Sequence, residues 1–174
     1  QRWPVTNHRW AQSAFGAASA AAIGGNDTVY CLTPLHHASG LLTTLGGTVV
    51  GGARIALSSG IGPESFAREV YRYGITVVSY TWTMLNGIVR DPDLAITDHN
   101  PIRLFIGSGM PAGLWDDVVT RFPEAGVMEF FATADGAAIL GDVSGTKVGS
   151  IGRPLPETNR VRVAAWDVIE ERFQ

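Results

Sequence analysis

Segments with the character of β-strands alternate with segments of helical character along most of the chain. β-Branched and aromatic residues form the short runs, and helix start and stop signals bound the longer segments. The expected strands are 28–32, 54–57, 76–80, 103–106 and 127–130, and the expected helices are 7–22, 41–50, 63–73, 84–90 and 111–122. This alternation predicts βαβ crossovers, and therefore an α/β fold with a mainly parallel sheet and helices on both faces.

Local signals define the ends of two of these helices. Asn7 stands where a side chain can cap the first turn of the first helix. Pro63 suits the first position of a later helix, and Gly74 suits the position just beyond its end.

The pattern changes after Gly136, where short Gly- and Pro-rich pieces replace the alternation. We therefore expect one partial domain, with an α/β subdomain over residues 1–136 and the start of a β-rich segment over 137–174. The run 161–165 has the composition of a strand. Because the chain opens on Gln1 and stops soon after that run, we expect it to be a piece of a longer protein.

Charge and composition exclude several classes of partner. The net charge is −3 and the basic residues are scattered, so nucleic acid is not an expected partner. The apolar run 14–25 is too short and too interrupted for a transmembrane segment. Cys31 is the only cysteine, which fits a cytoplasmic protein. Lys147 is the only lysine among 13 basic residues, a skew typical of GC-rich bacterial genomes.

Ligands of open parallel sheets bind beyond the carboxyl ends of the strands. This rule directs attention to four loops, at residues 34–40, 80–83, 107–111 and 131–136.

These loops carry the motifs of one family. Residues 34–40 resemble a P-L-F-H-x-x-G segment, 80–85 a V-P-T-M-L segment, 107–111 an S-G-G-A-P turn and 131–135 a Y-G-x-T-E segment. Residues 149–156 match G-S-x-G-R-P-L-P almost letter for letter. In this order and spacing, they resemble the ATP-dependent fatty-acid–CoA ligases (acyl-CoA synthetases) of the adenylate-forming, AMP-binding superfamily.

The resemblance implies one subdomain of the adenylate-forming enzyme fold, from the centre of its large N-terminal domain. It also implies ATP and Mg²⁺ as cofactors, CoA as co-substrate, and a fatty acid or acyl-adenylate as ligand. In the implied reaction a fatty carboxylate attacks the α-phosphate of ATP, and the CoA thiol then displaces AMP from the acyl-adenylate.

The resemblance also assigns site residues. It implies an acyl pocket at His37, Trp82 and Thr83, nucleotide binding at Gly107, Ser108, Gly109, Met110, Phe131, Ala132 and Thr133, and a Mg²⁺ ligand at Asp135.

Residue chemistry agrees with three of these assignments. The Phe131 ring can stack on adenine, and the Gly109 backbone can approach a ligand closely because glycine lacks a Cβ atom. Asp135 offers the hard oxygen that Mg²⁺ prefers.

Departures from the family pattern leave no complete catalytic set. Ala134 replaces a threonine, Asp135 a glutamate and Phe131 a tyrosine. The phosphate loop that precedes Thr6-Asn7 in the family has no counterpart here, nor do the ribose-binding segment and the lysine-bearing domain that follow. We therefore expect the isolated chain to be inactive, and to associate with the missing domains or with itself through exposed apolar surface.

Two alternatives remain open. Residues 107–112 fit the G-x-G-x-x-A fingerprint of a Rossmann-like dinucleotide-binding domain, with Glu129 as the acidic residue of the following strand. Pro111 weakens this reading because it removes an amide donor at the helix start. The other alternative is a non-catalytic remnant or interaction module.

Overall fold

A computed structural model of the chain describes residues 5–58, 62–133, 138–154, 161–162 and 164–173. Its elements are, in order, α1 (Asn7–Ala20), β1 (Thr28–Cys31), the π-helix η1 (Ser39–Leu45), α2 (Gly46–Gly51), β2 (Arg54–Leu57), α3 (Pro63–Tyr73), β3 (Val77–Thr81), α4 (Trp82–Val89), β4 (Leu104–Ser108), α5 (Ala112–Arg121), β5 (Gly126–Ala132), β6 (Ile139–Asp142), β7 (Arg153–Pro154), β8 (Trp166–Asp167) and β9 (Arg172–Phe173).

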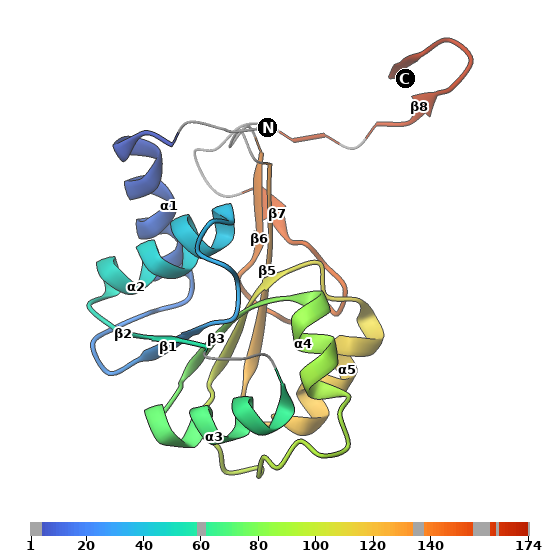
Figure 1. The fold of residues 1–174 in the computed structure, drawn as a ribbon. Coiled ribbons are helices and arrows are strands. Elements are labelled where there is room, and N and C mark those ends of the chain that lie inside the picture. The colour runs from blue at the N-terminus through green and yellow to red at the C-terminus, as the bar shows by residue number, and fades with distance from the viewer. Residues whose placement is uncertain (1–4, 59–61, 134–137, 155–160, 163, 174) are drawn as a thin grey trace.

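One twisted sheet organises the molecule, with strand order β2-β1-β3-β4-β5-β6-β7. The pairs from β2 to β5 are parallel, and β6 and β7 are antiparallel additions. Helices α1 and α2 lie on one side of the sheet, and α3, α4 and α5 lie on the other (Figure 1). The predicted α/β fold with a mainly parallel sheet and helices on both faces is therefore confirmed.

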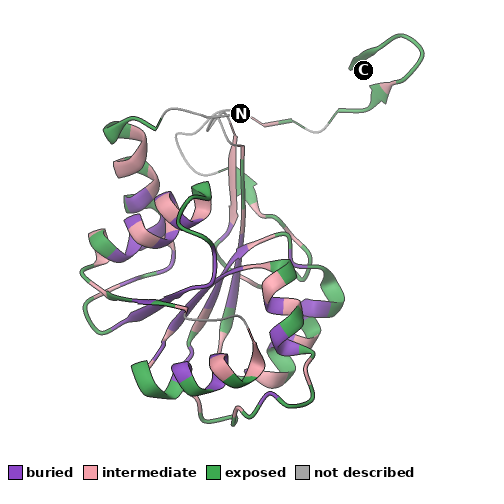
Figure 2. Ribbon diagram, viewed as in Figure 1, coloured by how far each residue is buried: buried purple, intermediate pink, exposed green. Residues whose placement is uncertain are grey.

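Alternation along the central strands supplies both layers with apolar side chains. Tyr80 and Phe105 belong to the larger core cluster with α3, α4 and α5. Val77, Ile106 and Met128 belong to a smaller cluster on the other face. Successive strand residues point to opposite faces, so strands covered on both sides read as nearly continuous apolar runs. Burial follows this layering (Figure 2).

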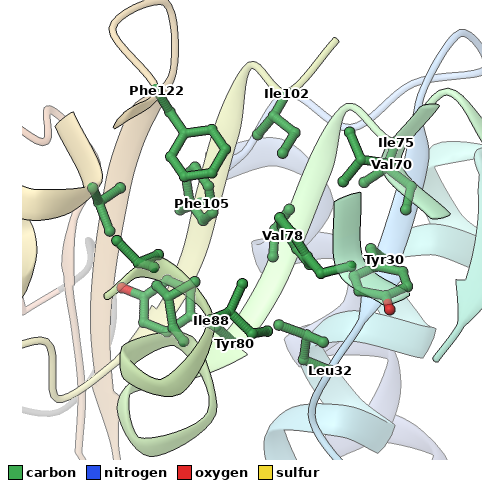
Figure 3. Close-up of a cluster of buried hydrophobic side chains, with 14 of the residues drawn as sticks. Tyr30, Leu32, Val70, Ile75, Val78, Tyr80, Ile88, Ile102, Phe105 and Phe122 are labelled. Carbon is green, nitrogen blue, oxygen red and sulfur yellow. The ribbon is translucent and has the colours of Figure 1, made fainter. Parts of the chain in front are cut away.

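The larger core is rich in aromatic side chains. The rings of Phe105 and Phe122 meet edge to face, with centroids 4.8 Å apart. Phe66 bridges Phe122 and Tyr30 through two further edge contacts. Figure 3 shows Phe122 close to Phe105, with Tyr30 on the other side of the cluster.

Several local expectations are wrong. Strands β4 and β5 run to Ser108 and Ala132, so the starts of the expected loops 107–111 and 131–136 belong to strands. Thr6, not Asn7, caps α1, because its hydroxyl accepts a hydrogen bond from the Arg9 amide at 3.2 Å. Helix α4 begins at Trp82 instead of residue 84, so Trp82 and Thr83 lie in its first turn and not in a loop. The expected helix 41–50 is two elements, the π-helix η1 and the α-helix α2. Residues 161, 162, 164 and 165 are not strand, and the β8–β9 hairpin follows them.

A polar joint holds the amino ends of the central strands, at the opposite edge from the predicted loops. Asp27 precedes β1, and its carboxylate accepts hydrogen bonds from the Arg103 guanidinium at 2.8 and 2.9 Å. It also accepts from the Thr76 hydroxyl at 2.6 Å and from the Gly24 amide at 2.9 Å. These contacts join the segments that lead into β1, β3 and β4.

Candidate functional site

Four connections leave the carboxyl edge of neighbouring parallel strands. The loop with His37 follows β1, Trp82 follows β3, Gly109 follows β4, and Phe131 lies near the end of β5. Because β1, β3, β4 and β5 are consecutive in the sheet, these four residues lie in that order along one edge. We call this edge, defined by His37, Trp82, Gly109 and Phe131, the carboxyl rim.

The turn after β4 brings the two predicted halves of the site together. Gly109 has a φ of +80°, which side chains other than hydrogen rarely allow. A Cβ atom at Gly109 would lie 3.2 Å from Cδ1 of Trp82, so the indole ring packs against this turn. The Trp82 side chain is still 45% exposed. A predicted acyl-pocket residue and a predicted nucleotide-binding residue are thus direct neighbours.

Glu129 on β5 supports the same turn from inside the protein. Its Oε2 accepts hydrogen bonds from the Gly109 amide at 2.8 Å and from the Met110 amide at 3.1 Å. Its Oε1 accepts a hydrogen bond from the Tyr80 hydroxyl. Glu129 is 2% exposed, so all three donors reach its carboxylate inside the protein.

Electrostatics in this cluster reflect burial. Loss of solvation raises the pKa of the Glu129 carboxyl, and the hydrogen bonds from Tyr80, Met110 and Gly109 oppose that rise. Burial is also the main reason that the Tyr80 pKa is raised far above its ordinary value, with the nearby Glu129 carboxylate adding to the shift. The Tyr80 hydroxyl therefore keeps its proton and donates it, and the Glu129 carboxylate accepts the three hydrogen bonds of the cluster.

Phe131 presents an aromatic surface on the carboxyl rim. Gly107 pairs with Glu129 across β4 and β5, and Gly109 and Phe131 each follow two residues later. Phe131 points to the same face of the sheet as Glu129, and its side chain is 43% exposed. Ala132 follows at the strand end, and the Thr133 hydroxyl accepts a hydrogen bond from the Ala138 amide at 3.0 Å.

His37 lies in the exposed loop that leads into η1. Its Nδ1 lies 2.7 Å from the Ser39 hydroxyl and accepts a hydrogen bond from the Ser39 amide at 3.3 Å. The wide turn of η1 places Thr44 so that its hydroxyl donates to the Ser39 carbonyl oxygen at 3.1 Å and lies 2.5 Å from the Ser79 hydroxyl. The π-helix thus links the histidine loop to β3.

The remaining predicted residues occupy varied settings. Gly107 is buried beneath the Tyr80 ring, Ser108 is half-buried, and the Met110 side chain is buried in the core. Thr83 lines a cavity of about 320 Å³ between the start of α3 and α4. Asp135 and Ala134 lie outside the described residues. Within the described ranges, no three His, Cys, Asp or Glu side chains come together in a way that could hold a metal ion.

A comparison with protein families identifies one family for this chain. A family model described as AMP-binding enzyme matches residues 4–171 of the chain.

The chain belongs to the AMP-binding enzyme family. Long-chain fatty acid transport protein 2 of Rattus norvegicus is 26% identical over 150 residues, which are 86% of this chain and 24% of that protein. Medium/long-chain-fatty-acid–CoA ligase FadD6 of Mycobacterium tuberculosis is 29% identical over 134 residues, 76% of this chain and 22% of the ligase. The chain therefore spans about a quarter of the length of these relatives.

Two solved structures share the fold of the chain. MbtA of Mycobacterium smegmatis superposes with a TM-score of 0.72 at 19% identity, covering 93% of this chain and 32% of MbtA. A benzoate CoA ligase from Burkholderia xenovorans LB400 superposes with a TM-score of 0.70 at 18% identity, covering 83% of this chain and 32% of the ligase. The described part of the chain contains no helix with the length and apolar character needed to cross a membrane.

Sequence reasoning considered Glu129 only as the acidic residue of a dinucleotide fingerprint and missed its contacts. The structure uses that carboxylate to bind the amides of Gly109 and Met110, which a pyrophosphate at this turn would need. A sequence signal was present, because an acidic residue inside an otherwise apolar strand is seldom buried without partners.

Proposed function

We propose that this chain is part of an adenylate-forming ligase that joins a fatty carboxylate to CoA, and that its carboxyl rim receives the acyl-adenylate. The contact between Trp82 and Gly109 is the observation that carries the proposal, because an apolar surface then lies next to the turn where we propose that the nucleotide binds. Family membership and the named activity of the mycobacterial relative support the reaction class.

The described residues fit the base end of a nucleotide. Phe131 offers an exposed ring on β5, the strand beside β4, which leads into Gly109, and aromatic rings stack favourably on planar bases. Trp82 adds an apolar surface on the other side of Gly109 for the start of the acyl group. Bound ATP would supply the adenylyl group and Mg²⁺ would screen its phosphates, with Asp135 as the proposed metal ligand.

The contribution of this chain is binding and orientation. A rim built on strand ends holds its groups on a rigid support, which favours a fixed relation between the base and the acyl carboxylate. Missing family residues, Ala134 in place of threonine above all, lead us to propose that the 174-residue chain binds the adenylate without turnover. Its partners would then be the other segments of such a ligase, or a second copy of the chain.

Calorimetric titration with a non-hydrolysable acyl-adenylate mimic, alongside NAD, tests the proposal. We expect the mimic to bind and NAD not to bind. Phe131→Ala should weaken binding about fivefold or more, because stacking on one aromatic ring contributes about 1–3 kcal/mol. Phe15→Ala is the matched control, since Phe15 is 62% exposed on α1. Binding of NAD in place of the mimic would contradict the proposal, and so would equal effects of the two substitutions.

A further inference from the structure

A buried glutamate stands in an apolar strand. On its face of β5, Glu129 follows Val127, which is packed in the larger core cluster. A buried carboxylate is costly unless hydrogen bonds compensate its lost hydration. An apolar side chain at position 129 would avoid that cost, so the role of the glutamate must be sought in its partners.

Those partners converge from two other strand ends. Two backbone amides of the Gly109–Met110 turn share Oε2, at 2.8 and 3.1 Å. The Tyr80 hydroxyl binds Oε1, and Tyr80 lies on β3 two residues before Trp82. One carboxylate therefore joins β3, the turn after β4, and β5 just inside the carboxyl rim.

We propose that Glu129 is a positioning residue, which fixes the Gly109–Met110 turn and, through Tyr80, the strand that presents Trp82. The role in ligand binding rests on the proposed function, whereas the shape of the turn can be measured without any ligand.

The same contacts define what the turn can offer a ligand. Its peptide bonds are trans, so the carbonyl oxygens of Ser108 and Gly109 point away from the carboxylate that binds the Gly109 and Met110 amides. The Gly109 and Met110 amides are therefore already bound by Glu129, so they are not free to donate to a phosphate group of a ligand.

A second pair with the same chemistry provides a control within the chain. The Tyr30 hydroxyl donates a hydrogen bond to Oε2 of Glu69 at 2.5 Å, and Glu69 is 4% exposed. Glu69 lies on α3 and joins that helix to β1, not to the Gly109–Met110 turn. Replacing either glutamate removes a buried acceptor from a tyrosine, but only position 129 also leaves two amides of the carboxyl rim without their partner.

The experiment compares Glu129→Met, Glu129→Gln and Glu69→Met in the full 174-residue chain. Glutamine keeps the acceptor for the turn, because its amide oxygen can accept from both amides, while its NH₂ group replaces the acceptor of the Tyr80 hydroxyl by a donor to the Tyr80 oxygen. Methionine keeps approximate volume but leaves both amides unpaired. Backbone amide hydrogen exchange, resolved by NMR and compared with the global unfolding rate of each variant, reports on the turn.

We expect the Gly109 and Met110 amides to exchange at least about tenfold faster in Glu129→Met, relative to core amides of the same variant. Exchange at these two amides should stay close to wild type in Glu129→Gln and in Glu69→Met. Unchanged exchange in Glu129→Met would overturn the proposal, and so would an equal acceleration in Glu69→Met.

Titration with the acyl-adenylate mimic separates the two claims. If wild type binds the mimic, Glu129→Met should weaken binding about tenfold or more and Glu129→Gln by less than about threefold. Binding that survives Glu129→Met would refute the role in the site. If wild type does not bind the mimic, the proposed function fails, while the exchange data still decide whether Glu129 fixes the turn.

Discussion

Tyr80 lies so close to the backbone of Gly107, near the end of β4, that only glycine fits at this position without a shift. A Cβ atom at Gly107 would lie 2.5 Å from the Tyr80 carbonyl oxygen and 2.7 Å from two atoms of its ring. Tyr80 is 1% exposed and bonded to Glu129, so it has no free space to move into. Gly107 therefore lets the Tyr80 ring lie flat over β4 and reach the carboxylate.

Gly107→Ala should lower the free energy of unfolding by about 1–3 kcal/mol, because overpacking forces the ring or the strand to shift. Gly87→Ala is the matched control, since a Cβ atom at this exposed position of α4 would meet nothing within 4 Å. That substitution should be neutral, or stabilising by up to about 1 kcal/mol, because alanine is the better helix former. Urea unfolding of both variants measures the difference, and equal stabilities would contradict this account of Gly107.

Single-residue contacts were the part of the site that the sequence predicted least. Placing Gly109 and Phe131 on one edge required only the order of strands and loops. The contacts of Glu129 required the register of three strands, because its partners lie 19, 20 and 49 positions away. The pairing of Asp142 on β6 with Glu129 could likewise not be predicted from local sequence patterns.

At the scale of elements, the alternating pattern predicted most of the sheet. Strand β2 was predicted with its observed bounds, and helix α3 was predicted from Pro63 to Tyr73. The π-helix was missed because apolar composition favours a helix without fixing its hydrogen-bond spacing. The strand expected at 161–165 failed because β-branched residues form a strand only where a partner strand is available.

The contacts of Asp27, which join the segments before β1, β3 and β4, should make the stability of the chain depend on pH. The hydrogen bond from Arg103 is the main reason that the Asp27 pKa is far below its ordinary value. A carboxyl whose pKa is lowered by folding adds stability above its unfolded pKa, and that stability is lost as the pH falls below it. The wild-type chain should therefore lose stability as the pH falls below about 4, the ordinary aspartate value.

Asp27→Asn should lower the free energy of unfolding by about 1–2 kcal/mol at neutral pH, because the charged hydrogen bonds with Arg103 are lost. The difference in the free energy of unfolding between variant and wild type should become smaller as the pH falls below about 4, because the wild type then loses the stabilisation from the ionised Asp27 carboxylate. Asp93→Asn is the control, since the Asp93 amide, not its carboxylate, makes the local bond to Asp91. Urea unfolding at a series of pH values measures the difference, and a constant difference would contradict the role of the ion pair.

At the scale of the whole molecule, the sheet and the C-terminal hairpin differ in burial. Figure 1 shows the β8–β9 hairpin apart from the sheet, and Figure 2 shows it largely exposed. Val168 is 78% exposed, Ile169 91% and Phe173 71%. Trp166 and Phe173 meet edge to face, with ring centroids 4.9 Å apart, but a two-stranded hairpin alone is only marginally stable in water.

Removal of residues 161–174 should therefore separate folding from self-association. The sheet has its own core, so the free energy of unfolding of the shortened chain should lie within about 0.5 kcal/mol of that of the full chain. Exposed apolar side chains favour association, so the shortened chain should remain monomeric at higher concentration in sedimentation experiments. The double substitution Val168→Ser and Ile169→Ser keeps the chain length, and it should also reduce self-association. A large loss of stability on truncation would mean that the hairpin packs against the sheet, and unchanged association would place the self-contact on another surface.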